Sequence, residues 1–572
     1  METQGFPDLP QSTYALIERS ARLFGDQTAI SFVPAVDQHR APVRHSYRDL
    51  WAGVTRTANL FHAMGLQADD VIAIILPGLA ETHFIQWGAE ATGIALPINS
   101  MLESSAIADL LRRSEARAVV TVASSFDAEV HRRVLEAISG APEVVNLVLI
   151  ESQDSPGGGS DDPIRPEHLG GPVETTLYNQ AMAAQSGSSL NSQRHIRSEE
   201  IASMFCTGGT TGAPKLAQHT HGNEVANAWM TAMAIGPGYV SGDTVLCGLP
   251  LFHVNAAVIS GLAAFYRGVN VLLVTPQGFR GSQVIQRFWE IVDHHRVAAF
   301  SAVPTLFTSL IQQPFADYDL SCLKFALCAA SPMSIELMNQ VERLTGVTIV
   351  EAYGLTEATC TVSMNPLKGE RRVGSVGLPL PFEEIRIVVR DPISGLDRLA
   401  EDGETGSVVV AGPHVFPGYL SEQHNIGLWV DQGDDRKWLD TGDLGVVDVD
   451  GYLWLKGRTK DLIIRSGHNL DPAMIEDAFY AHPSVAMAAA IGRDDDYAGE
   501  VPVVYVQLRE GHHVGADDLA DFARSRIHER PAWPKEVIVI ETLPLTVVGK
   551  VFKPTLRKMD QARRDGVKND AG

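Results

Sequence analysis

The stretch VIAIILPGLAETHFIQWGAEATGIALPI, residues 71–98, decides the fold class of this chain. Residues 71–76 are all apolar, Pro77-Gly78 ends that run, and Ile94–Ile98 is apolar again after a segment of helical length. Continuous apolar strands are typical of a parallel sheet buried on both faces, because a helix crosses over between two parallel strands. The stretch therefore predicts a strand–helix–strand unit of an α/β fold.

The same rhythm continues on both sides of this unit. Residues 12–24 have a polar start and then apolar residues at helical spacing, which predicts an amphipathic opening helix. Since 572 residues exceed one hydrophobic core, we expect two to four domains in a large α/β architecture with parallel-type sheets flanked by helices. Further strand-like runs are residues 117–123, 144–150, 269–274, 298–303 and 325–330, residues 127–139 are helical in pattern, and the polar stretches 152–163 and 184–193 are predicted loops.

The charge balance excludes some classes of partner. Lys plus Arg number 46 against 69 Asp plus Glu, a net charge of −23, which disfavours nonspecific binding to nucleic acid or anionic membranes. The most apolar stretches, residues 71–76 and 254–266, are shorter than the ~20 residues of a membrane span, and residues 1–10 lack the features of a secretory signal. Five scattered cysteines without a CxxC pair indicate reduced thiols rather than disulfides or a cysteine zinc site. We expect a cytoplasmic protein.

A glycine- and threonine-rich loop follows the apolar residues 201–205. It reads Thr207-Gly208-Gly209-Thr210-Thr211-Gly212-Ala213-Pro214-Lys215. The glycines allow backbone N–H groups to approach an anion, the hydroxyls can donate to phosphate oxygens, and Lys215 adds positive charge. The lysine stands three places after the last glycine, which disfavours a Walker A loop. A flexible surface turn is the alternative interpretation.

Three later segments carry groups that suit a nucleotide. In Glu351–Glu357 (EAYGLTE) an aromatic ring can stack on a base, a hydroxyl can reach a phosphate and a carboxylate can bind Mg²⁺, although Thr356 could instead cap a helix. Asp443 stands in a predicted glycine-bounded turn, where it could accept hydrogen bonds from ribose hydroxyls or be an ordinary turn acid. Residues 451–461 predict a short strand that ends in charges, and Lys550 follows a glycine near the C-terminus.

In this order the segments resemble the signature series of the adenylate-forming superfamily, which includes acyl-CoA synthetases of the AMP-dependent synthetase and ligase family, firefly luciferase and the adenylation domains of peptide synthetases. The resemblance covers nearly the whole chain. It runs from the Leu16 helix through the Thr207 loop, Leu249–His253 (LPLFH), YGLTE, Gly403–Gly406 (GETG), TGD at 441–443 and GRTKD at 457–461 to Lys550.

The resemblance implies an ATP-dependent acid:CoA ligase. A carboxylate would attack the α-phosphate of ATP to give an acyl-AMP and pyrophosphate, and the thiol of coenzyme A would then take the acyl group and release AMP. Lys550 and Mg²⁺ would neutralise the charge that grows at the α-phosphate. ATP, Mg²⁺ and coenzyme A are thus the expected cofactor and co-substrates.

The resemblance also implies a role for each motif residue. The Thr207–Lys215 loop would hold the β- and γ-phosphates, Tyr353 would stack on adenine between Ala352 and Gly354, and Asp443 and Arg458 would fix the ribose. Glu357, with Thr207, would bind Mg²⁺, and Thr356 would contact the α-phosphate. His253, at the end of a predicted LPLF strand, would stand at the mouth of the acyl pocket; a packed core histidine is the alternative. The expected catalytic residues are Lys550, His253, Thr356 and Glu357.

Two successive reactions at one site imply a moving C-terminal domain. By motif match the hinge is Lys460, which predicts an N-terminal adenylation domain of residues 1–459 and a small mobile α+β domain of residues 460–572. After rotation, Gly467 would leave room for the pantetheine arm of coenzyme A. The sequence leaves the oligomeric state open, and a homodimer is one assembly that it allows.

One departure from the family pattern lies beside the expected adenine and acyl sites. The chain reads Cys328-Ala329-Ala330-Ser331-Pro332 where the family usually has a GGAP or GAAP turn, so Ala330 and Ser331 are the expected adenine-side residues here. The acyl pocket is expected to be lined by mostly small residues: His253, Val254, Asn255, Ala256, Ala257, the segment 301–304 with Val303, and Ala329.

Small apolar walls predict a medium or long fatty acid, or a bulky aryl-containing or alicyclic acid. An amino acid is disfavoured because no acidic residue is placed to pair with an α-ammonium group. The short tail after the Lys550 motif favours coenzyme A over a carrier domain within the chain. Alternatives that stay open are loading of a separate carrier protein, luciferase-type oxidation and a noncatalytic nucleotide-binding relative; a P-loop NTPase, which would release ADP, is a rival from another class.

Overall fold

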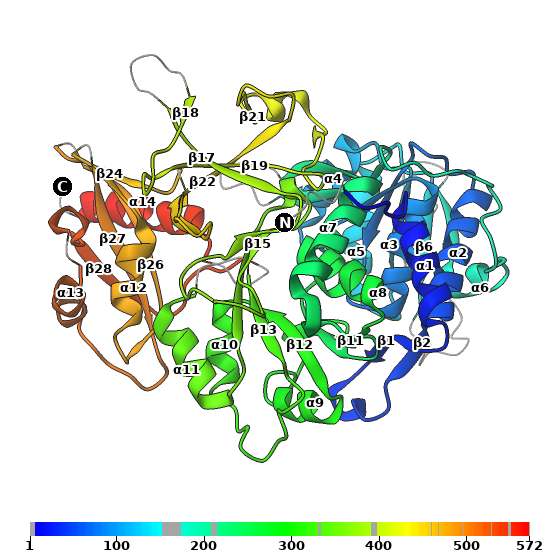
Figure 1. Cartoon of the computed structure of the whole chain (residues 1–572), viewed down its shortest axis with the longest axis horizontal. Helices are drawn as coiled ribbons and strands as arrows, with labels where there is room; N and C mark the ends of the chain where they lie inside the picture. The colour runs from blue at the N-terminus through cyan, green and yellow to red at the C-terminus, as the bar shows by residue number, and fades with distance from the viewer. Residues whose placement is uncertain are drawn as a thin grey trace.

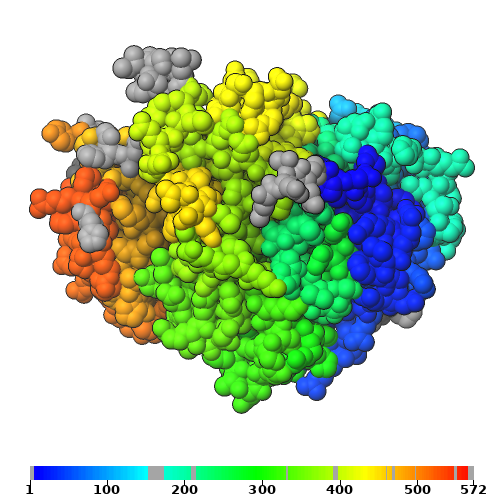
Figure 2. Space-filling view, viewed as in Figure 1, coloured from blue at the N-terminus to red at the C-terminus, as the bar shows by residue number. Residues whose placement is uncertain are grey.

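The computed structural model describes residues 6–151, 173–207, 214–329, 333–390, 397–458, 460–466, 468–495, 497–527, 529–546 and 551–570, with the backbone alone at 468, 469 and 565–570. Within these residues the strands form four sheets. Three belong to the chain up to Arg458, and the fourth lies at one end of the molecule, in the orange and red segments (Figures 1 and 2). The predicted α/β fold class is confirmed.

The first sheet contains the strand–helix–strand unit of residues 71–98. Its order is β20-β9-β8-β4-β3-β5-β6-β7, and β3 pairs in parallel with both β4 and β5. All residues of β3 are buried, because helices cover both faces of the parallel part. The strands are β3 Val71–Ile75, β4 Ile94–Pro97, β5 Ala118–Val122, β6 Asn146–Ile150, β7 Glu174–Leu177, β8 Ile201–Thr207, β9 Lys215–Thr220 and β20 Gly418–Tyr419, and the helices are α2 Tyr47–Ala63, α3 Ala80–Thr92, α4 Ser104–Arg113, α5 Ala128–Ser139, α6 Tyr178–Ala183 and α7 His221–Ile235.

The second sheet has nine strands in the order β16-β15-β14-β13-β12-β10-β11-β1-β2. Its central strands are parallel, and β14 then pairs antiparallel with β15. The opening helix α1 begins at the predicted place, since the Ser12 side chain accepts a hydrogen bond from the Ala15 N–H. The elements are α1 Thr13–Phe24, β1 Thr28–Val33, β2 Val43–Ser46, β10 Thr244–Cys247, α8 Ala264–Arg267, β11 Asn270–Val274, α9 Phe288–His294, β12 Val297–Ala302, α10 Pro304–Leu310, β13 Phe325–Cys328, α11 Ile335–Thr345, β14 Ile349–Gly354, β15 Thr361–Met364 and β16 Leu378–Pro379.

The third and fourth sheets divide the C-terminal third of the chain. The third has the order β18-β17-β19-β22-β21, with β23 paired to β22, and the fourth has the order β25-β24-β27-β26, with β28 parallel to β27. The chain therefore changes sheet between Arg458 and Ile463. The elements are β17 Glu384–Arg390, β18 Asp397–Leu399, β19 Gly406–Ala411, β21 Trp429–Val430, β22 Trp438–Val447, β23 Leu453–Arg458, β24 Ile463–Arg465, β25 His468–Leu470, α12 Pro472–Tyr480, β26 Val485–Asp495, β27 Gly499–Leu508, α13 Ala516–Arg524, β28 Glu536–Ile540 and α14 Lys553–Asp570.

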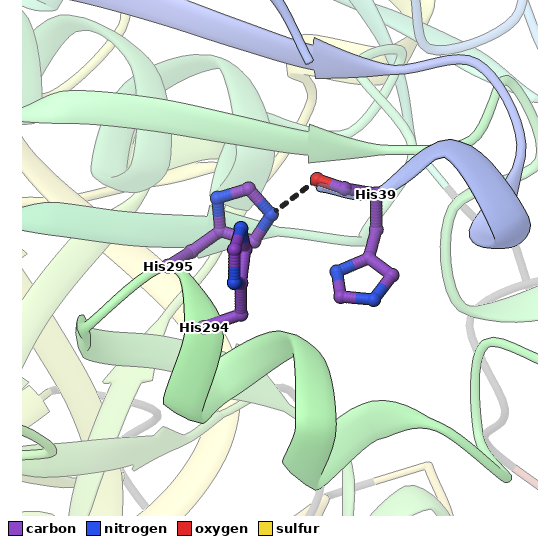
Figure 3. Close-up of side chains that lie close together, drawn as sticks. All are labelled: His39, His294 and His295. Carbon is purple, nitrogen blue, oxygen red and sulfur yellow. Dashed lines mark hydrogen bonds between the residues drawn. The ribbon is translucent and has the colours of Figure 1, made fainter. Parts of the chain in front are cut away.

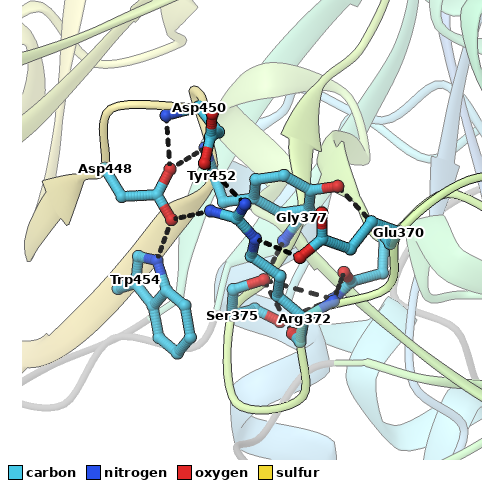
Figure 4. A network of polar contacts seen from close by, with 9 residues as sticks. Glu370, Arg372, Ser375, Gly377, Asp448, Asp450, Tyr452 and Trp454 are labelled. Atoms are coloured by element: carbon cyan, nitrogen blue, oxygen red, sulfur yellow. Dashed lines mark hydrogen bonds and ion pairs between the residues drawn. The ribbon is translucent and has the colours of Figure 1, made fainter.

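Arg372 joins the second sheet to the β22–β23 hairpin (Figure 4). Its guanidinium donates to Asp448 at 2.7 Å, to Asp450 at 2.6 Å and to Glu370 at 3.1 Å, and its carbon lies 4.4 Å from the centre of the Tyr452 ring. Three carboxylates around one planar cation form a network, which fixes geometry better than an isolated surface pair. This network holds in place the two strands that carry Asp443 and Arg458.

Two local predictions were wrong. Residues 249–252 are not a strand, because β10 already ends at Cys247 and a turn containing Pro250, which has no N–H to donate, leads to His253. Asp443 lies within the ten-residue strand β22 rather than in a turn, since the backbone absorbs Gly442 at φ 71° where the β19–β22 register is irregular, between Asp440 and Leu444.

Shorter helices complete the described structure. A π-helix at Asn255–Ala263 follows His253, and no helix among the described residues combines the length and the apolar character needed to cross a bilayer. Residues 184–193 form the predicted loop, whereas 152–163 lie outside the described residues. The 3-10 turns are Val36–Gln38, Gly236–Gly238, Gly278–Arg280, Thr356–Ala358, Glu422–Asn425 and Arg530–Ala532.

Candidate active site

A cavity of about 1190 Å³ lies between the two large sheets and the C-terminal part of the chain. Its walls include the end of β14, the start of the π-helix, the first residues of α10, and α12 from the C-terminal part. Ligand sites of α/β proteins form at the carboxyl ends of parallel strands, where loops leave the sheet. The volume exceeds what a single drug-sized ligand fills, so there is room for more than one substrate.

The EAYGLTE segment enters this cavity as the end of β14. Gly354 is needed there, because a Cβ would lie 1.7 Å from the carbonyl oxygen of Cys360, the residue before β15. Thr356 then begins a single 3-10 turn whose N-cap is Leu355, with no capping bond from a side chain. Thr356 is therefore not a helix cap, and its side chain is available at the cavity wall together with Ala352 and Tyr353.

Asp443 joins Tyr353 to Arg458. The Tyr353 hydroxyl donates to one Asp443 oxygen at 2.5 Å, and Arg458 Nε donates to the other at 2.9 Å. Asp443 and Arg458 are direct partners in the β22–β23 register. Burial, followed by the negative charge of Asp443, raises the pKa of Tyr353 well above its usual value, and the same carboxylate raises the pKa of Arg458. Three residues that the resemblance assigns to the nucleoside thus form one contact group.

Glu357 is held by a residue that the sequence analysis missed. The Tyr419 hydroxyl donates to a Glu357 oxygen, and Lys215 Nζ lies 4.6 Å from the centre of the Tyr419 ring. Burial, and then the charge of Glu357, raise the pKa of Tyr419. No motif marks Tyr419, because only the pairing of β20 with β9, which sets Tyr419 opposite Ala217, brings it to the site.

His219 is a second missed residue. It is fully buried, and its Nε2 donates to the Thr356 carbonyl oxygen at 2.7 Å. The ring stacks on Phe205 with centroids 5.3 Å apart, and its Nδ1 lies 3.7 Å from a Glu224 oxygen. His219 stands on β9 four residues after Lys215, so this bond ties the strand that leaves the glycine-rich loop to the YGLTE segment.

The expected acyl residues separate into two groups. His253, Val254, Asn255 and Ala329 line the cavity, and Ile259 joins them. In a π-helix hydrogen bonds join residues five apart, so Val254 and Ile259 share a face. By contrast, Ala256, Ala257 and Val303 are buried and do not belong to the described lining.

Several expected site residues lie outside the described residues: Gly208, Gly209, Thr210, Thr211, Gly212, Ala330, Ser331, Gly467 and Lys550. Their flanks are described. Thr207 pairs with Lys215 across the β8–β9 hairpin, and Thr207 lines the cavity. Leu545 and Val551, which flank the Lys550 segment, form an antiparallel bridge and line the same cavity. Lys460 is exposed, and Arg465 donates to the Pro531 carbonyl at 2.7 Å.

Comparison with known proteins places this chain in a family. A model described as AMP-binding enzyme matches residues 17–420, and one described as AMP-binding enzyme C-terminal domain matches residues 474–550. The chain belongs to the AMP-binding enzyme family. A marinolic acid–CoA ligase of Pseudoalteromonas sp. is 35% identical to it over 543 residues, covering 94% of this chain and 79% of that relative.

Further relatives and solved structures are similar to this chain over nearly its whole length. A long-chain-fatty-acid–CoA ligase of Salmonella typhimurium is 30% identical, covering 97% of this chain and 96% of its own. Among solved structures, o-succinylbenzoate CoA synthetase of Bacillus subtilis with its acyl-adenylate intermediate has a TM-score of 0.74 at 25% identity, covering 96% and 98% of the two chains. An anthranilate CoA ligase with anthranoyl-AMP shares the fold, with a TM-score of 0.81 at 21% identity and coverage of 98% and 99%.

These findings confirm the resemblance to the adenylate-forming superfamily. The protein is an enzyme of the acid–thiol ligase class, AMP-forming, whose relatives are named CoA ligases. ATP and coenzyme A are the co-substrates that this class uses.

Proposed function

We propose that this enzyme converts a hydrophobic carboxylic acid to its acyl-AMP and then to its acyl-CoA. The observation that carries the proposal is the grouping of Thr207, Tyr353, Glu357, Arg458 and His253 around one cavity. Thr207, Tyr353 and Arg458 come from three different sheets, Glu357 from the 3-10 turn after β14, and His253 from the turn that precedes the π-helix. A cavity of about 1190 Å³ accommodates a nucleotide and an acyl chain side by side.

The proposed site for the nucleoside of ATP rests on the contacts that join Tyr353, Asp443 and Arg458. A carboxylate accepts two hydrogen bonds from vicinal hydroxyls, and Asp443 already accepts two from Tyr353 and Arg458. We assign Asp443 and Arg458 to the ribose and the Tyr353 ring, with Ala352, Gly354, Ala330 and Ser331, to adenine. The loop from Thr207 to Lys215, closed by strand pairing at its two ends, would hold the outer phosphates.

Glu357 and Thr207 suit Mg²⁺, because the ion prefers hard oxygen ligands and usually keeps waters between few protein contacts. Both residues line the cavity, and Tyr419 fixes one Glu357 oxygen while the carboxylate remains the acceptor. The ion would supply charge neutralisation at the phosphates. Two residues would act on the α-phosphate directly. The Thr356 hydroxyl would donate a hydrogen bond to it, and Lys550 would approach it from the C-terminal part.

The acid would lie along the π-helix. Val254, Ile259, Pro304 and Ala329 give this side of the cavity an apolar wall, and His253 stands where the wall meets the nucleotide residues. The named acids of two relatives, marinolic acid and long-chain fatty acids, support a medium or long aliphatic substrate over a small one. Aryl and alicyclic acids remain within the proposed class.

The second half-reaction would require movement about Lys460. This residue is exposed, and it lies between the last strand of the third sheet and the first strand of the fourth. Gly467, in the segment that follows β24, would then admit the pantetheine arm. We place the domain boundary there, with residues 1–459 as the adenylation domain and 460–572 as the mobile domain, and propose the cytoplasm as the compartment, where the five free cysteines stay reduced.

The test is a panel of carboxylic acids scored for AMP and pyrophosphate, each with and without coenzyme A. Aliphatic acids of medium or long chain should release pyrophosphate without coenzyme A and give thioester with it. If thioester forms only on a separate carrier protein, that protein and not coenzyme A is the acyl acceptor. Release of ADP, or no ATP cleavage with any acid in the panel, would refute the proposal.

Lys550→Ala tests the assignment of charge neutralisation. We expect adenylate formation to fall about 10²- to 10³-fold, while thioester formation from supplied acyl-adenylate survives. Lys558→Ala, an exposed lysine on α14, is the matched control and should retain both half-reactions. Equal loss of both half-reactions in Lys550→Ala would contradict the assigned role.

A further inference from the structure

Three histidine rings meet away from the cavity, where the connection between β1 and β2 passes the end of α9. His294 and His295 end that helix, and His39 follows the 3-10 turn Val36–Gln38. One nitrogen of each ring lies within 4.8 Å of one nitrogen of each of the others. Figure 3 shows the adjacent rings of His294 and His295 facing the ring of His39. None of the three lines the large cavity.

The His39 ring is fixed and fully buried. Its Nε2 lies 3.1 Å from a Glu290 oxygen, whereas its Nδ1 is buried and makes no hydrogen bond in the described structure. A buried nitrogen without a partner is unfavourable unless a ligand satisfies it. In Figure 3 this unpaired side of the ring faces His294. Glu290 therefore orients the His39 ring through Nε2, and Nδ1 is left to accept a ligand.

The contacts around the rings are those that support metal-bound imidazoles in proteins. Metal-bound histidines usually donate their second N–H to a carboxylate or a backbone carbonyl, which sets the tautomer and the ring orientation. Glu290 supplies the carboxylate for His39, and the His39 carbonyl oxygen accepts from His295 Nε2 at 2.8 Å. To bind a metal ion, the His295 ring must either turn its Nδ1 towards the other two rings or give up the hydrogen bond from Nε2 to the His39 carbonyl oxygen and bind the ion with Nε2.

Charged side chains of both signs lie near the three rings. Glu290 also accepts from Arg287 at 2.7 Å and from Arg40 at 3.3 Å, and Arg287 pairs in turn with Asp37 at 2.8 Å. Arginines near the rings disfavour a cation, and Arg44 adds to this effect at His295. Arg287 and Arg40 are both directed to carboxylates, and the exposed fractions of their side chains are 28% and 71%. These ion pairs fix Glu290, which in turn fixes His39.

We propose that His39, His294 and His295 form a binding site for a Zn²⁺-class ion. Three imidazole nitrogens suit Zn²⁺ and the neighbouring late divalent metals, and a water would complete a tetrahedron. Nitrogens at Zn–N distances of ~2.0–2.1 Å lie about 3.3 Å apart, so the rings must draw together by about 1.5 Å from their present limit of 4.8 Å. The ion would join the β1–β2 connection to α9, a site independent of the proposed reaction.

The test is Zn²⁺ binding to the full chain, prepared without a histidine tag and stripped with a chelator. Metal content after dialysis should approach one ion per chain, and Zn²⁺ should raise the thermal unfolding midpoint. Co²⁺ in place of Zn²⁺ should give visible absorption bands typical of tetrahedral nitrogen ligation. His294→Ala, at an exposed position that should not disturb folding, should lose both the bound ion and the rise in midpoint.

Two further variants sharpen the result. The double variant His512→Ala/His513→Ala removes an exposed adjacent pair on the C-terminal part and should bind like the wild type. Glu290→Gln should weaken binding about 10- to 100-fold, the loss typical for a group that supports a ligand. The proposal is overturned by a wild type that retains no Zn²⁺, by equal binding in His294→Ala, or by loss of binding in the His512/His513 variant.

Discussion

Asp443 holds its two partners with a carboxylate that is almost fully buried, while Arg458 remains half exposed. We predict that Asp443→Asn raises the KM for ATP about 10- to 100-fold with a smaller effect on kcat. Hydrogen bonds to a charged group contribute about 1.5–3 kcal/mol, and contacts to ribose act equally on substrate and transition state. The measurement is initial rates of pyrophosphate release against ATP concentration.

Glu404→Gln is the matched control for that prediction. Glu404 also pairs with an arginine in the third sheet region, at 2.6 Å from Arg398, but neither Glu404 nor Arg398 lines the cavity, whereas Tyr353 and Arg458, the two partners of Asp443, both do. Its KM for ATP should stay at the wild-type value. An unchanged KM in Asp443→Asn would remove Asp443 from the ribose site.

Gly354 supports a prediction about stability. In Gly354→Ala the new Cβ would meet three backbone atoms of Cys360 and Thr361, the nearest at 1.7 Å, and backbone cannot rotate away as a side chain can. We expect a loss of about 3 kcal/mol in the free energy of unfolding, measured by denaturant titration. Gly346→Ala, at φ 72° with no atom within 4 Å of its Cβ, should lose only about 1 kcal/mol. Similar losses in the two variants would contradict this account.

At the level of single residues, a candidate could be predicted where a short motif carries it, and the roles assigned to these candidates stay predictions. Tyr353, Asp443 and Arg458 were each found in a short segment, and the structure joins them. Tyr419 and His219 could not be found in this way, because their neighbours at the site are distant in sequence and strand pairing alone brings them together.

Between elements, the bond from His219 to Thr356 connects β9 with the turn that follows β14. We predict that His219→Ala lowers kcat for adenylate formation about tenfold or more, because a small displacement of a positioning contact is enough to slow a reaction that depends on orientation. His219→Gln, whose amide can still donate, should recover part of the rate. Pre-steady-state release of pyrophosphate is the measurement.

His131→Ala provides the comparison. His131 is also buried and lies 2.9 Å from a backbone carbonyl oxygen, that of Val122, in the first sheet. Its loss should lower stability without a comparable effect on kcat. If both variants lower kcat equally, His219 acts through general stability alone.

Prediction of elements was reliable for buried parallel strands and poor near the site. The runs that became β3, β4, β5 and β6 are short, apolar and bounded by turn residues, and packing on both faces leaves few alternatives. Leu249–Phe252 has the same apolar character, yet Pro250 prevents strand pairing there. The π-helix after it has no sequence signature, since its wider turn depends on tertiary packing.

Across the whole molecule, α12 of the C-terminal part faces α11 at the cavity. Burial, together with Glu476 and Glu336, raises the pKa of Asp477 to about 7. With α12 against α11, the raised pKa means that Asp477 binds its proton more tightly than when the two helices are apart. This arrangement is therefore favoured at low pH and becomes less stable as the pH rises towards 7. Because the Asp477 side chain is exposed and water screens these charges, from pH 6 to pH 8 we expect at most about a tenfold shift towards arrangements in which α12 leaves α11.

Small-angle X-ray scattering at the two pH values measures that shift. Asp477→Asn should remove most of the pH dependence, whereas Asp517→Asn, an exposed acid on α13, should leave it unchanged. A wild-type scattering profile that is the same at pH 6 and pH 8 would show that Asp477 does not govern the arrangement.

The pairing of Asp443 with Arg458 has one more consequence. Arg458 ends β23 and stands two places before Lys460, so the same carboxylate that we assign to the ribose also restrains the last strand before the proposed hinge. If ribose hydroxyls bind Asp443 and Arg458 together, as we propose, the sugar and the strand before the hinge would share one carboxylate. Binding of ATP at Asp443 would then also steady the strand that precedes Lys460, so occupancy of the nucleotide site and the freedom of the hinge would be linked.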